Sequence, residues 1–298
     1  MTGSVVLITG ASSGLGKSIA MNLHGKEYLV IGAMRDCQGK NAGIASEMTG
    51  IGIDVVDIDV TDDGSVASGV ENAMRLHGRI DVLINCAGIM PTGITEAFDT
   101  AQFEQVLQTN LIGPFRMMKA VLPHMRAAAS GLLINVSSIG GRMTLPGFGI
   151  YAASKWGLEG LAESIGYEVS KLGIDSVILE PSLYLTDLKA KGYGPADTAV
   201  LDGYHALSDM NERISAHFRP AVAASGASTD PATLADYVAE LIRMPPGQRP
   251  IRATVGFDTG TAALNKAAGE LQSQHLRFMG IADMERVGAA TTKEPQAS

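Results

Sequence analysis

The sequence predicts an α/β protein that folds as one domain, with a doubly wound parallel sheet of about seven strands flanked by helices. Short apolar runs alternate along the chain with longer windows that have helical periodicity. A cluster of glycines follows the first apolar run, at the point where a strand would turn into a helix. This alternation is typical of βαβ units, which build parallel sheets. No Pro/Ser-rich linker or run of charge divides residues 1–298, so we expect a single domain.

The apolar runs place the predicted strands at residues 4–9, 28–33, 52–58, 81–84, 132–136, 175–179 and 249–255. The helical windows place crossover helices at residues 15–23, 62–76, 101–129 and 151–172. Thr229, Asp230 and Pro231 read as an N-cap followed by a first-turn proline, which opens a helix to about residue 243. A last helix is expected over residues 259–278, followed by a loose tail at residues 289–298.

Composition narrows the classes of partner and compartment. With 23 Lys and Arg residues against 31 Asp and Glu, the net charge of -8 offers no basic stripe for a nucleic-acid backbone. No segment reaches the roughly 20 apolar residues that span a bilayer, and the N-terminus lacks the basic region of a signal peptide. Cys37 and Cys86 are the two cysteines, and no His or Cys spacing suits a metal. We therefore expect a cytoplasmic protein without a nucleic-acid, membrane or metal partner.

The segment Thr-Gly-Ala-Ser-Ser-Gly-Leu-Gly at residues 9–16 predicts an anion site. The first strand ends here and the next helix opens, so backbone N–H groups and the positive end of the helix dipole meet at one point. Such a site suits the pyrophosphate of a dinucleotide. The spacing differs from Gly-x-Gly-x-x-Gly, and a plain tight turn is the alternative. The candidate cofactor-binding residues of this segment are Gly10, Ser12, Ser13, Gly14, Leu15 and Gly16.

Arg35 and Asp36 stand at the end of the second predicted strand, where the adenosine ribose of a dinucleotide would lie. An Asp there accepts hydrogen bonds from both ribose hydroxyls and favours NAD, whereas an Arg pairs with a 2′-phosphate and favours NADP. We favour NADP(H) over NAD(H), because Arg35 comes first and Ser12 can donate to the same phosphate. A solvated ion pair is the alternative for both residues. Asp59, after the third strand, is a candidate for the adenine edge or, alternatively, for a cap of the next helix.

Tyr151 and Lys155 are four residues apart in a predicted helix, which places an ammonium group beside a phenol and favours loss of the phenol proton. Tyr167 and Lys171 repeat the spacing, but at about 100° per residue Tyr167 lies roughly 160° around the helix from Tyr151. Both pairs cannot face one cavity, so one must be a surface pair. We assign the site to Tyr151, because Ser138 ends a strand-like run just before it, and active sites form at strand ends in open α/β sheets.

Taken in order, these motifs resemble the short-chain dehydrogenase/reductase (SDR) family over residues 5–186. The resemblance implies a Rossmann-type fold and an NAD(P)-dependent enzyme that acts on CH–OH groups (EC 1.1.1.-). The family's adenine-contacting Asp-Val and its Asn-Asn-Ala-Gly motif both have counterparts, although Cys86 replaces the second Asn. The cofactor-binding residues that these two motifs imply are Asp59, Val60, Asn85, Ala87 and Gly88.

The family's catalytic tetrad falls on Asn110, Ser138, Tyr151 and Lys155. The resemblance implies that Tyr151 exchanges a proton with the substrate oxygen while Ser138 hydrogen-bonds that oxygen. It also implies that Lys155 lowers the pKa of Tyr151 and holds the nicotinamide ribose, so both residues contact the cofactor. Asn110 would hold a water that links Lys155 to solvent, with a satisfied core Asn as the alternative reading.

After the sixth strand the family has a Pro-Gly pair and a Thr that contacts the nicotinamide carboxamide. Pro181 and Thr186 match, whereas Ser182 replaces the Gly and reaches positive φ less readily. Residues 183–221, rich in Leu and Tyr, are expected to form a substrate lid or, alternatively, a pair of surface helices. We expect an apolar pocket for a ketone, aldehyde or alcohol with a hydrophobic body.

The family analogy also predicts a homodimer or homotetramer, built by the long helices at residues 101–129 and 151–172. An NAD-linked secondary alcohol dehydrogenase and a nucleotide-binding sensor without catalysis are the alternative functions. Epimerases and dehydratases of this fold usually carry a larger substrate domain than this chain provides.

Overall fold

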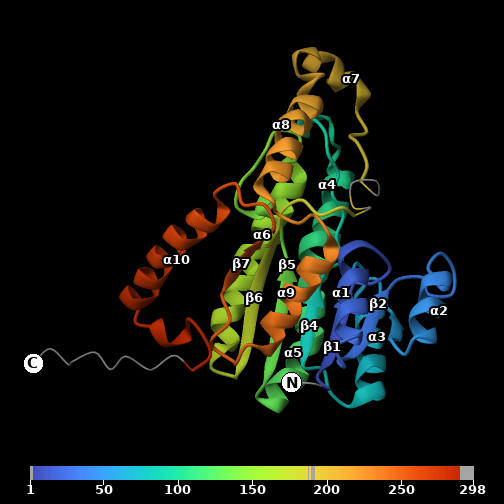
Figure 1. Ribbon diagram of the computed structural model, residues 1–298, viewed down its shortest axis with the longest axis vertical. Helices are drawn as coiled ribbons and strands as arrows, with labels where there is room; N and C mark the ends of the chain where they lie inside the picture. Colours follow the sequence, from blue (N-terminus) through green and yellow to red (C-terminus); the bar gives the residue numbers. More distant parts are fainter. Residues whose placement is uncertain (1–2, 187, 189–191, 289–298) are drawn as a thin grey trace, which may run out of the picture.

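The computed structural model describes residues 3–186, 188 and 192–288, and its centre is a parallel sheet in the order β3-β2-β1-β4-β5-β6-β7 (Figure 1). The strands are β1 (Val5–Thr9), β2 (Leu29–Met34), β3 (Asp54–Asp57), β4 (Val82–Asn85), β5 (Gly131–Val136), β6 (Ile174–Pro181) and β7 (Arg252–Val255). The order reverses between β1 and β4, because the chain builds β1 to β3 outward on one side and then crosses over. Ligands of open parallel sheets bind at such a switch point, beyond the carboxyl ends of the strands. The predicted α/β class with seven parallel strands is confirmed.

The helices are α1 (Gly14–His24), α2 (Ala42–Gly50), α3 (Asp63–His77), α4 (Thr100–Leu107), α5 (Gly113–Ala128), α6 (Gly149–Ser170), α7 (Thr198–Leu201), α8 (Met210–Ser225), α9 (Pro231–Arg243) and α10 (Thr261–Phe278). Shorter helical segments are η1 (Thr95–Ala97), η2 (Gln108–Ile112), η3 (Ile139–Gly141), η4 (Asp202–Leu207) and η5 (Ala282–Met284). Within the described residues, no helix combines the length and the apolar character needed to cross a bilayer.

Helices bury the sheet on both faces. On β1, Val6 and Ile8 belong to one core cluster and Val5 and Leu7 to another, because successive strand side chains point to opposite faces. Residues of α1, α2 and α9 complete the first cluster, and residues of α3, α5 and α6 complete the second. This two-sided burial explains why the strands are continuous apolar runs in the sequence.

The predicted strands and most long helices lie within a few residues of the observed ones. Asp230 caps α9 as expected, since its carboxylate accepts from the backbone N–H of Ala232 at 2.9 Å. The helix predicted at residues 101–129 is present as an unbroken helical stretch, in which η2, a π-helical segment, joins α4 to α5. The sequence also gave no indication of α2, which is short and buries Met48 alone. The predicted tail at 289–298 and positions 187 and 189–191 of the predicted lid lie outside the described residues.

Thr9 ties the end of β1 to the segment after β4. Its Oγ1 accepts hydrogen bonds from the backbone N–H groups of Cys86 at 3.0 Å and Ala87 at 3.1 Å. The hydroxyl also donates to the carbonyl oxygen of Ile84 at 3.5 Å. One buried side chain therefore sets the separation of the two strand ends between which the crevice opens.

We predict that Thr9→Val lowers the free energy of unfolding by about 1–3 kcal/mol, because it keeps the side-chain shape but leaves two backbone N–H groups without their acceptor. Urea denaturation at an unchanged m-value measures the loss. Thr49→Val is the control, since it removes an exposed hydroxyl that donates to the carbonyl oxygen of Ala45, and we expect a change within about 0.5 kcal/mol. Equal losses in the two variants would contradict the role of Thr9.

Candidate active site

The glycine segment forms the turn between β1 and α1, as predicted. Gly10 (φ 71°) lies so close to the segment after β4 that an added Cβ would be 2.8 Å from Cα of Ala87. A Cβ on Gly16 would be 2.4 Å from the carbonyl oxygen of Gly10. These approaches of backbone to backbone exclude a side chain at either position. The N-terminus of α1 therefore opens at the switch point of the sheet, where the sequence predicts the anion site.

A groove of about 400 Å³ lies beside this N-terminus. Gly14, in α1, and Thr186, after β6, both line the groove, and a Cβ added to Gly14 would be 3.4 Å from Cβ of Thr186. Two predicted cofactor residues that are far apart in the sequence thus lie together. The other lining residues are Lys17, Ser18, Met21, Leu185, Asp230 and Pro231.

Arg35 and Asp36 have different surroundings after β2. The carboxylate of Asp36 accepts a hydrogen bond from the backbone N–H of Lys40 at 2.7 Å, and the backbone of Asp36 is left-handed (φ 55°). The side chain of Arg35 is 67% exposed, with its guanidinium 3.8 Å from a carboxylate oxygen of Asp59. The Asp36 carboxylate is thus engaged in the local turn, while the guanidinium of Arg35 faces solvent.

The alternative reading of Asp59 as a helix cap is wrong. Asp62 caps α3 by accepting from the backbone N–H of Ser65 at 2.6 Å. Asp59 instead accepts from the backbone N–H and the hydroxyl of Thr61, at 2.9 and 2.7 Å. Burial opposes ionisation, but these bonds and the charge of Arg35 outweigh it and hold the pKa of Asp59 below its ordinary value. The contact of Asp59 with adenine stays a prediction, and the neighbouring Val60 is buried.

The segment after β4 contributes backbone more than side chains. Asn85 donates from Nδ2 to Oδ1 of Asn135 on β5 at 2.9 Å, so its amide lies within the sheet. Burial raises the pKa of the Cys86 thiol to about 12, which makes it a poor nucleophile. Gly88 reaches the centre of the site, since an added Cβ would be 3.4 Å from Oδ1 of Asn110 and 3.8 Å from Nζ of Lys155.

Ser138, Tyr151 and Lys155 come together beyond the carboxyl end of β5. Ser138 hydrogen-bonds the Tyr151 phenol, and its Oγ accepts from the backbone N–H of Gly140 at 3.0 Å. Tyr151 and Lys155 are both buried on α6, and Nζ of Lys155 lies 5.9 Å from the centroid of the Tyr151 ring. The same ammonium donates to the carbonyl oxygen of Val136 at 2.9 Å.

Burial controls the protonation of the Tyr–Lys pair. It raises the pKa of Tyr151, and the hydrogen bond with Ser138 offsets this only in part. Burial also lowers the pKa of Lys155 to about 8, although the negative charge of Glu159 opposes the change. Desolvation of the phenolate therefore dominates the pKa of Tyr151 in this arrangement, and the lowering of that pKa by Lys155 stays a prediction. Burial thus favours the protonated form of Tyr151.

Asn110 lies buried in η2, between α4 and α5. Its Oδ1 accepts from the backbone N–H of Ile89 at 2.9 Å, and its Nδ2 donates to the carbonyl oxygen of Ile89 at 2.9 Å and to Oγ of Ser154 at 3.0 Å. These bonds satisfy the amide within the protein and favour the reading as a core Asn. They also hold the segment after Gly88 against α6. The role of holding a water stays a prediction.

The replacement of the family's Gly by Ser182 causes no backbone strain. β6 ends at Pro181, which pairs with Val255 of β7. Ser182 continues this pairing, because its backbone N–H donates to the carbonyl oxygen of Val255 at 3.0 Å. Ser182 does not adopt a positive φ, so the chain leads from β6 to Thr186 without the conformation that favours glycine.

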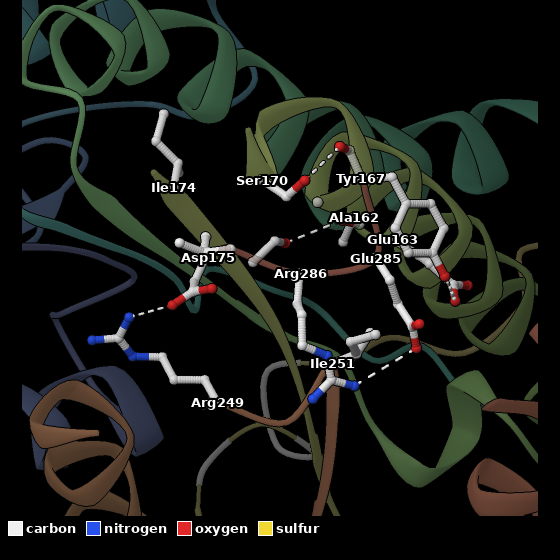
Figure 2. A pocket seen from close by; sticks show the side chains of 13 residues that line it. Ala162, Glu163, Tyr167, Ser170, Ile174, Asp175, Arg249, Ile251, Glu285 and Arg286 are labelled. Carbon is white, nitrogen blue, oxygen red and sulfur yellow. Dashed lines mark hydrogen bonds and ion pairs between the residues drawn. The ribbon is translucent and has the colours of Figure 1, made fainter. Parts of the chain in front are cut away.

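The second Tyr–Lys pair is not the surface pair that the sequence suggested. Tyr167 is half-buried and donates to Oε1 of Glu163 at 2.7 Å, while Lys171 forms an ion pair with Asp283 at 2.9 Å. Tyr167 lines a separate cleft of about 20 Å³, bordered by Asp175, Arg249, Glu285 and Arg286 (Figure 2). A cavity of that size has room for about one water, so it is not a competing substrate site.

Sequence reasoning missed a buried charge network behind η3. Glu159, which is 2% exposed, accepts from Oγ of Ser137 at 2.8 Å and from Nε of Arg252 at 3.1 Å. Arg252 also pairs with Glu163 at 2.7 Å. Glu180 lies 3.8 Å from Arg252, and burial, followed by the charge of Glu159, raises the pKa of Glu180 to about 7. The network joins the turn that carries Ser138 to α6, β6 and β7.

Part of this network leaves a signal in the sequence. Tyr151, Lys155, Glu159, Glu163 and Tyr167 follow one another at intervals of four along α6, so they form one ridge of the helix. Polar residues repeated along one ridge of an otherwise apolar helix indicate a buried polar contact. The partner Arg252 is 93 residues from Glu159 and gives no such signal.

In the part of the chain that the structure describes, no group of three or more His, Cys, Asp or Glu side chains is arranged to hold a metal ion.

Comparison with known proteins decides the family. Residues 4–193 match the short chain dehydrogenase family. The chain belongs to the short-chain dehydrogenase/reductase family. The match agrees with the family resemblance that the ordered motifs predict.

Two curated relatives each match somewhat under two thirds of the chain. The chain is 40% identical over 189 residues to 3-ketodihydrosphingosine reductase from Bacteroides thetaiotaomicron. The aligned region covers 62% of this chain and 66% of that relative. The chain is 36% identical over 203 residues to retinol dehydrogenase 8 from Homo sapiens. Here the aligned region covers 66% of this chain and 64% of that relative. The chain thus spans slightly under two thirds of the length of these relatives.

Solved SDR structures extend the similarity over most of the fold. A short-chain dehydrogenase from Streptomyces avermitilis superimposes with a TM-score of 0.75 at 26% identity, over 93% of this chain and 97% of that one. Actinorhodin polyketide ketoreductase, solved with NADPH, gives a TM-score of 0.69 at 26% identity, over 87% and 97% of the two chains. The predicted Rossmann-type architecture is confirmed.

We predict that Glu159→Gln lowers the free energy of unfolding by about 1.5–3 kcal/mol, because it weakens charged hydrogen bonds with Ser137 and Arg252. Chemical denaturation at pH 7 measures the effect. Glu168→Gln, on the same helix, is the control, since Glu168 is exposed and accepts a hydrogen bond from the hydroxyl of Ser164. We expect a change within about 0.5 kcal/mol. A Glu159→Gln variant as stable as this control would show that the network does not hold the turn.

Proposed function

We propose that this protein is an NADP-dependent oxidoreductase that interconverts a ketone or aldehyde and the corresponding alcohol on hydrophobic substrates. The observation that carries the proposal is the group formed by Ser138, Tyr151 and Lys155 beside Gly88. A phenol kept protonated by burial, a hydroxyl bonded to it and a nearby ammonium are the parts that proton transfer to a carbonyl oxygen requires.

The dinucleotide, when bound, supplies a hydride to the carbonyl carbon or accepts one from the alcohol carbon. In reduction, Tyr151 gives its proton to the carbonyl oxygen as negative charge grows there, and Ser138 donates a hydrogen bond to the same oxygen. The raised pKa of Tyr151 keeps this proton in place at neutral pH. Lys155, with a pKa of about 8, is charged at neutral pH and stabilises the phenolate that Tyr151 becomes.

The cradle between β1 and α1 fits a dinucleotide. Gly10 and Gly16 have no room for a Cβ, and the residues proposed to contact the pyrophosphate follow at the N-terminus of α1. Arg35 supports NADP(H) over NAD(H), because its guanidinium is exposed while the carboxylate of Asp36 already accepts from Lys40. The similarity to a ketoreductase solved with NADPH points the same way.

A hydrophobic substrate is supported by the rim of the site and by the relatives. Met143 and Leu145, which follow η3, are 39% and 49% exposed. Residues 183–221 are proposed to form the lid, and two contacts support this: Tyr193 donates to the carbonyl oxygen of Gln102 at 3.0 Å, and Met210 is buried where its Cε meets Gly147. The two curated relatives are named for 3-ketodihydrosphingosine and retinol.

We further propose that α5 and α6 build a homodimer or homotetramer, since Phe115 and Trp156 on these helices are 42% and 45% exposed. The reducing cytoplasm is the proposed compartment, because Cys37 and Cys86 are free thiols.

Tyr151→Phe tests the catalytic role. We expect turnover to fall by about 10²- to 10⁴-fold, because the proton donor is lost, with NADPH binding retained. Ketone-dependent NADPH oxidation measures turnover, and nicotinamide fluorescence measures binding. Tyr237→Phe is the control, because Tyr237 packs against the core on α9. Full turnover in Tyr151→Phe would refute the assignment.

Arg35→Ala tests the cofactor preference. Loss of one charged hydrogen-bonding partner of the 2′-phosphate lowers the binding free energy of NADPH by about 1.5–3 kcal/mol. We therefore expect NADPH to bind roughly 10- to 150-fold more weakly, and NADH to bind as before. Fluorescence titration with each nucleotide gives both constants, and Arg75→Ala, an exposed change on α3, controls for net charge. Equal weakening of both nucleotides, or of neither, would contradict NADP selection by Arg35.

A further inference from the structure

The helix α10 has little of the packing that a helix of its length needs. Of its 18 residues, Thr261 and Leu276 are buried. It lies at the side of the molecule, apart from the helices that cover the sheet (Figure 1). Most of the stability of a helix in a protein comes from the packing of an apolar face. A further surface is therefore expected on α10.

The exposed side of α10 carries a stripe that is apolar except at Gln274. Leu264, Leu271 and Phe278, at intervals of seven, are 38%, 66% and 85% exposed. Ala267 and Gln274, also exposed, fall between them. The resulting spacing of three and four residues is that of a coiled-coil seam. We call these five residues the α10 seam.

The first turn of α10 is fixed to the body, so the seam has a set orientation. Asn265 accepts from Nε of Arg142 at 2.8 Å and donates to Oε2 of Glu180 at 2.5 Å. Leu276, near the other end, is buried on the side of the helix opposite the seam. The seam therefore faces away from the protein at both ends of the helix.

We propose that the α10 seam binds the same seam of a second copy of this chain, with the two helices antiparallel. In one register of this pairing Ala267 faces Phe278 of the second copy, so a small side chain receives a large one. Leu271 then faces Gln274 of the second copy, and both residues are exposed. A two-fold axis repeats each contact.

Charge complementarity favours this occupant and this register. Glu270 and Arg277 are exposed and flank the seam on the same side. In the antiparallel register, Glu270 lies opposite Arg277 of the second copy, and the two-fold axis creates the contact twice. A parallel pair would instead place Gln274 against Gln274 in the apolar seam. The surface is thus complementary to itself in size and charge, as a contact between identical chains requires.

Sedimentation velocity of the full chain tests the proposal. The seam variant carries Leu271→Glu with Phe278→Glu, and the control carries Ala262→Glu with Lys266→Gln, which changes net charge equally on α10 outside the seam. We expect the seam variant to have half the mass of the wild-type species at 20 µM, and the control to keep the wild-type mass. A monomeric wild type, or a seam variant of unchanged mass, would overturn the proposal.

A charge exchange tests the register. Glu270→Arg alone places two Arg side chains opposite each other, so we expect the dissociation constant to rise at least 5-fold. Adding Arg277→Glu restores the opposite charges, and the constant should return to within 2-fold of wild type. A double variant that dissociates as readily as the single one would overturn the antiparallel pairing. Association through α5 and α6 is unaffected by these changes, and neither test depends on turnover.

Discussion

The close approach of Gly10 to Ala87 is the constraint on which the rest of the site depends. It brings the end of β1 against the segment after β4, and the Thr9 hydroxyl holds the two together by accepting from both backbone N–H groups of that segment. The same segment continues to Gly88, which lies against Asn110 and Lys155. The cradle for the nucleotide and the group of proton-transfer residues are therefore fixed by one contact between strands, at the switch point of the sheet.

Burial gives this site its electrostatic character. It raises the pKa of Tyr151 and lowers that of Lys155 to about 8, so the two groups titrate under the control of the same apolar surroundings. Behind them, Glu159 and Glu163 share Arg252, which keeps buried carboxylates paired with a cation. The single ridge of α6 thus carries the proposed chemistry at one end and the support for the Ser138 turn further along.

Local patterns predicted most of the fold and singled out the candidate residues that the structure brings together beyond the carboxyl end of β5. The strands are apolar on both faces and therefore stand out in the sequence, whereas α2 buries Met48 alone and leaves no comparable signal. Spacing along α6 marked Tyr151 and Lys155, but their pKa shifts depend on burial, which spacing does not reveal. The partner of Glu159, Arg252, is brought near by the pairing of β6 with β7. The hydrogen bond that the Asp36 carboxylate accepts from Lys40, and the one that Asn85 donates to Asn135 on β5, likewise depend on three-dimensional contacts.

The central claim is that this site transfers a hydride between a nicotinamide dinucleotide and a hydrophobic carbonyl compound. The most direct test incubates the protein with NADPH deuterated at both C4 positions and a panel of hydrophobic ketones, and analyses the products by mass spectrometry. The account predicts an alcohol with one deuterium on the carbinol carbon for each NADPH oxidised. Ketones recovered unreduced across the panel, with NADPH bound but not oxidised, would contradict it.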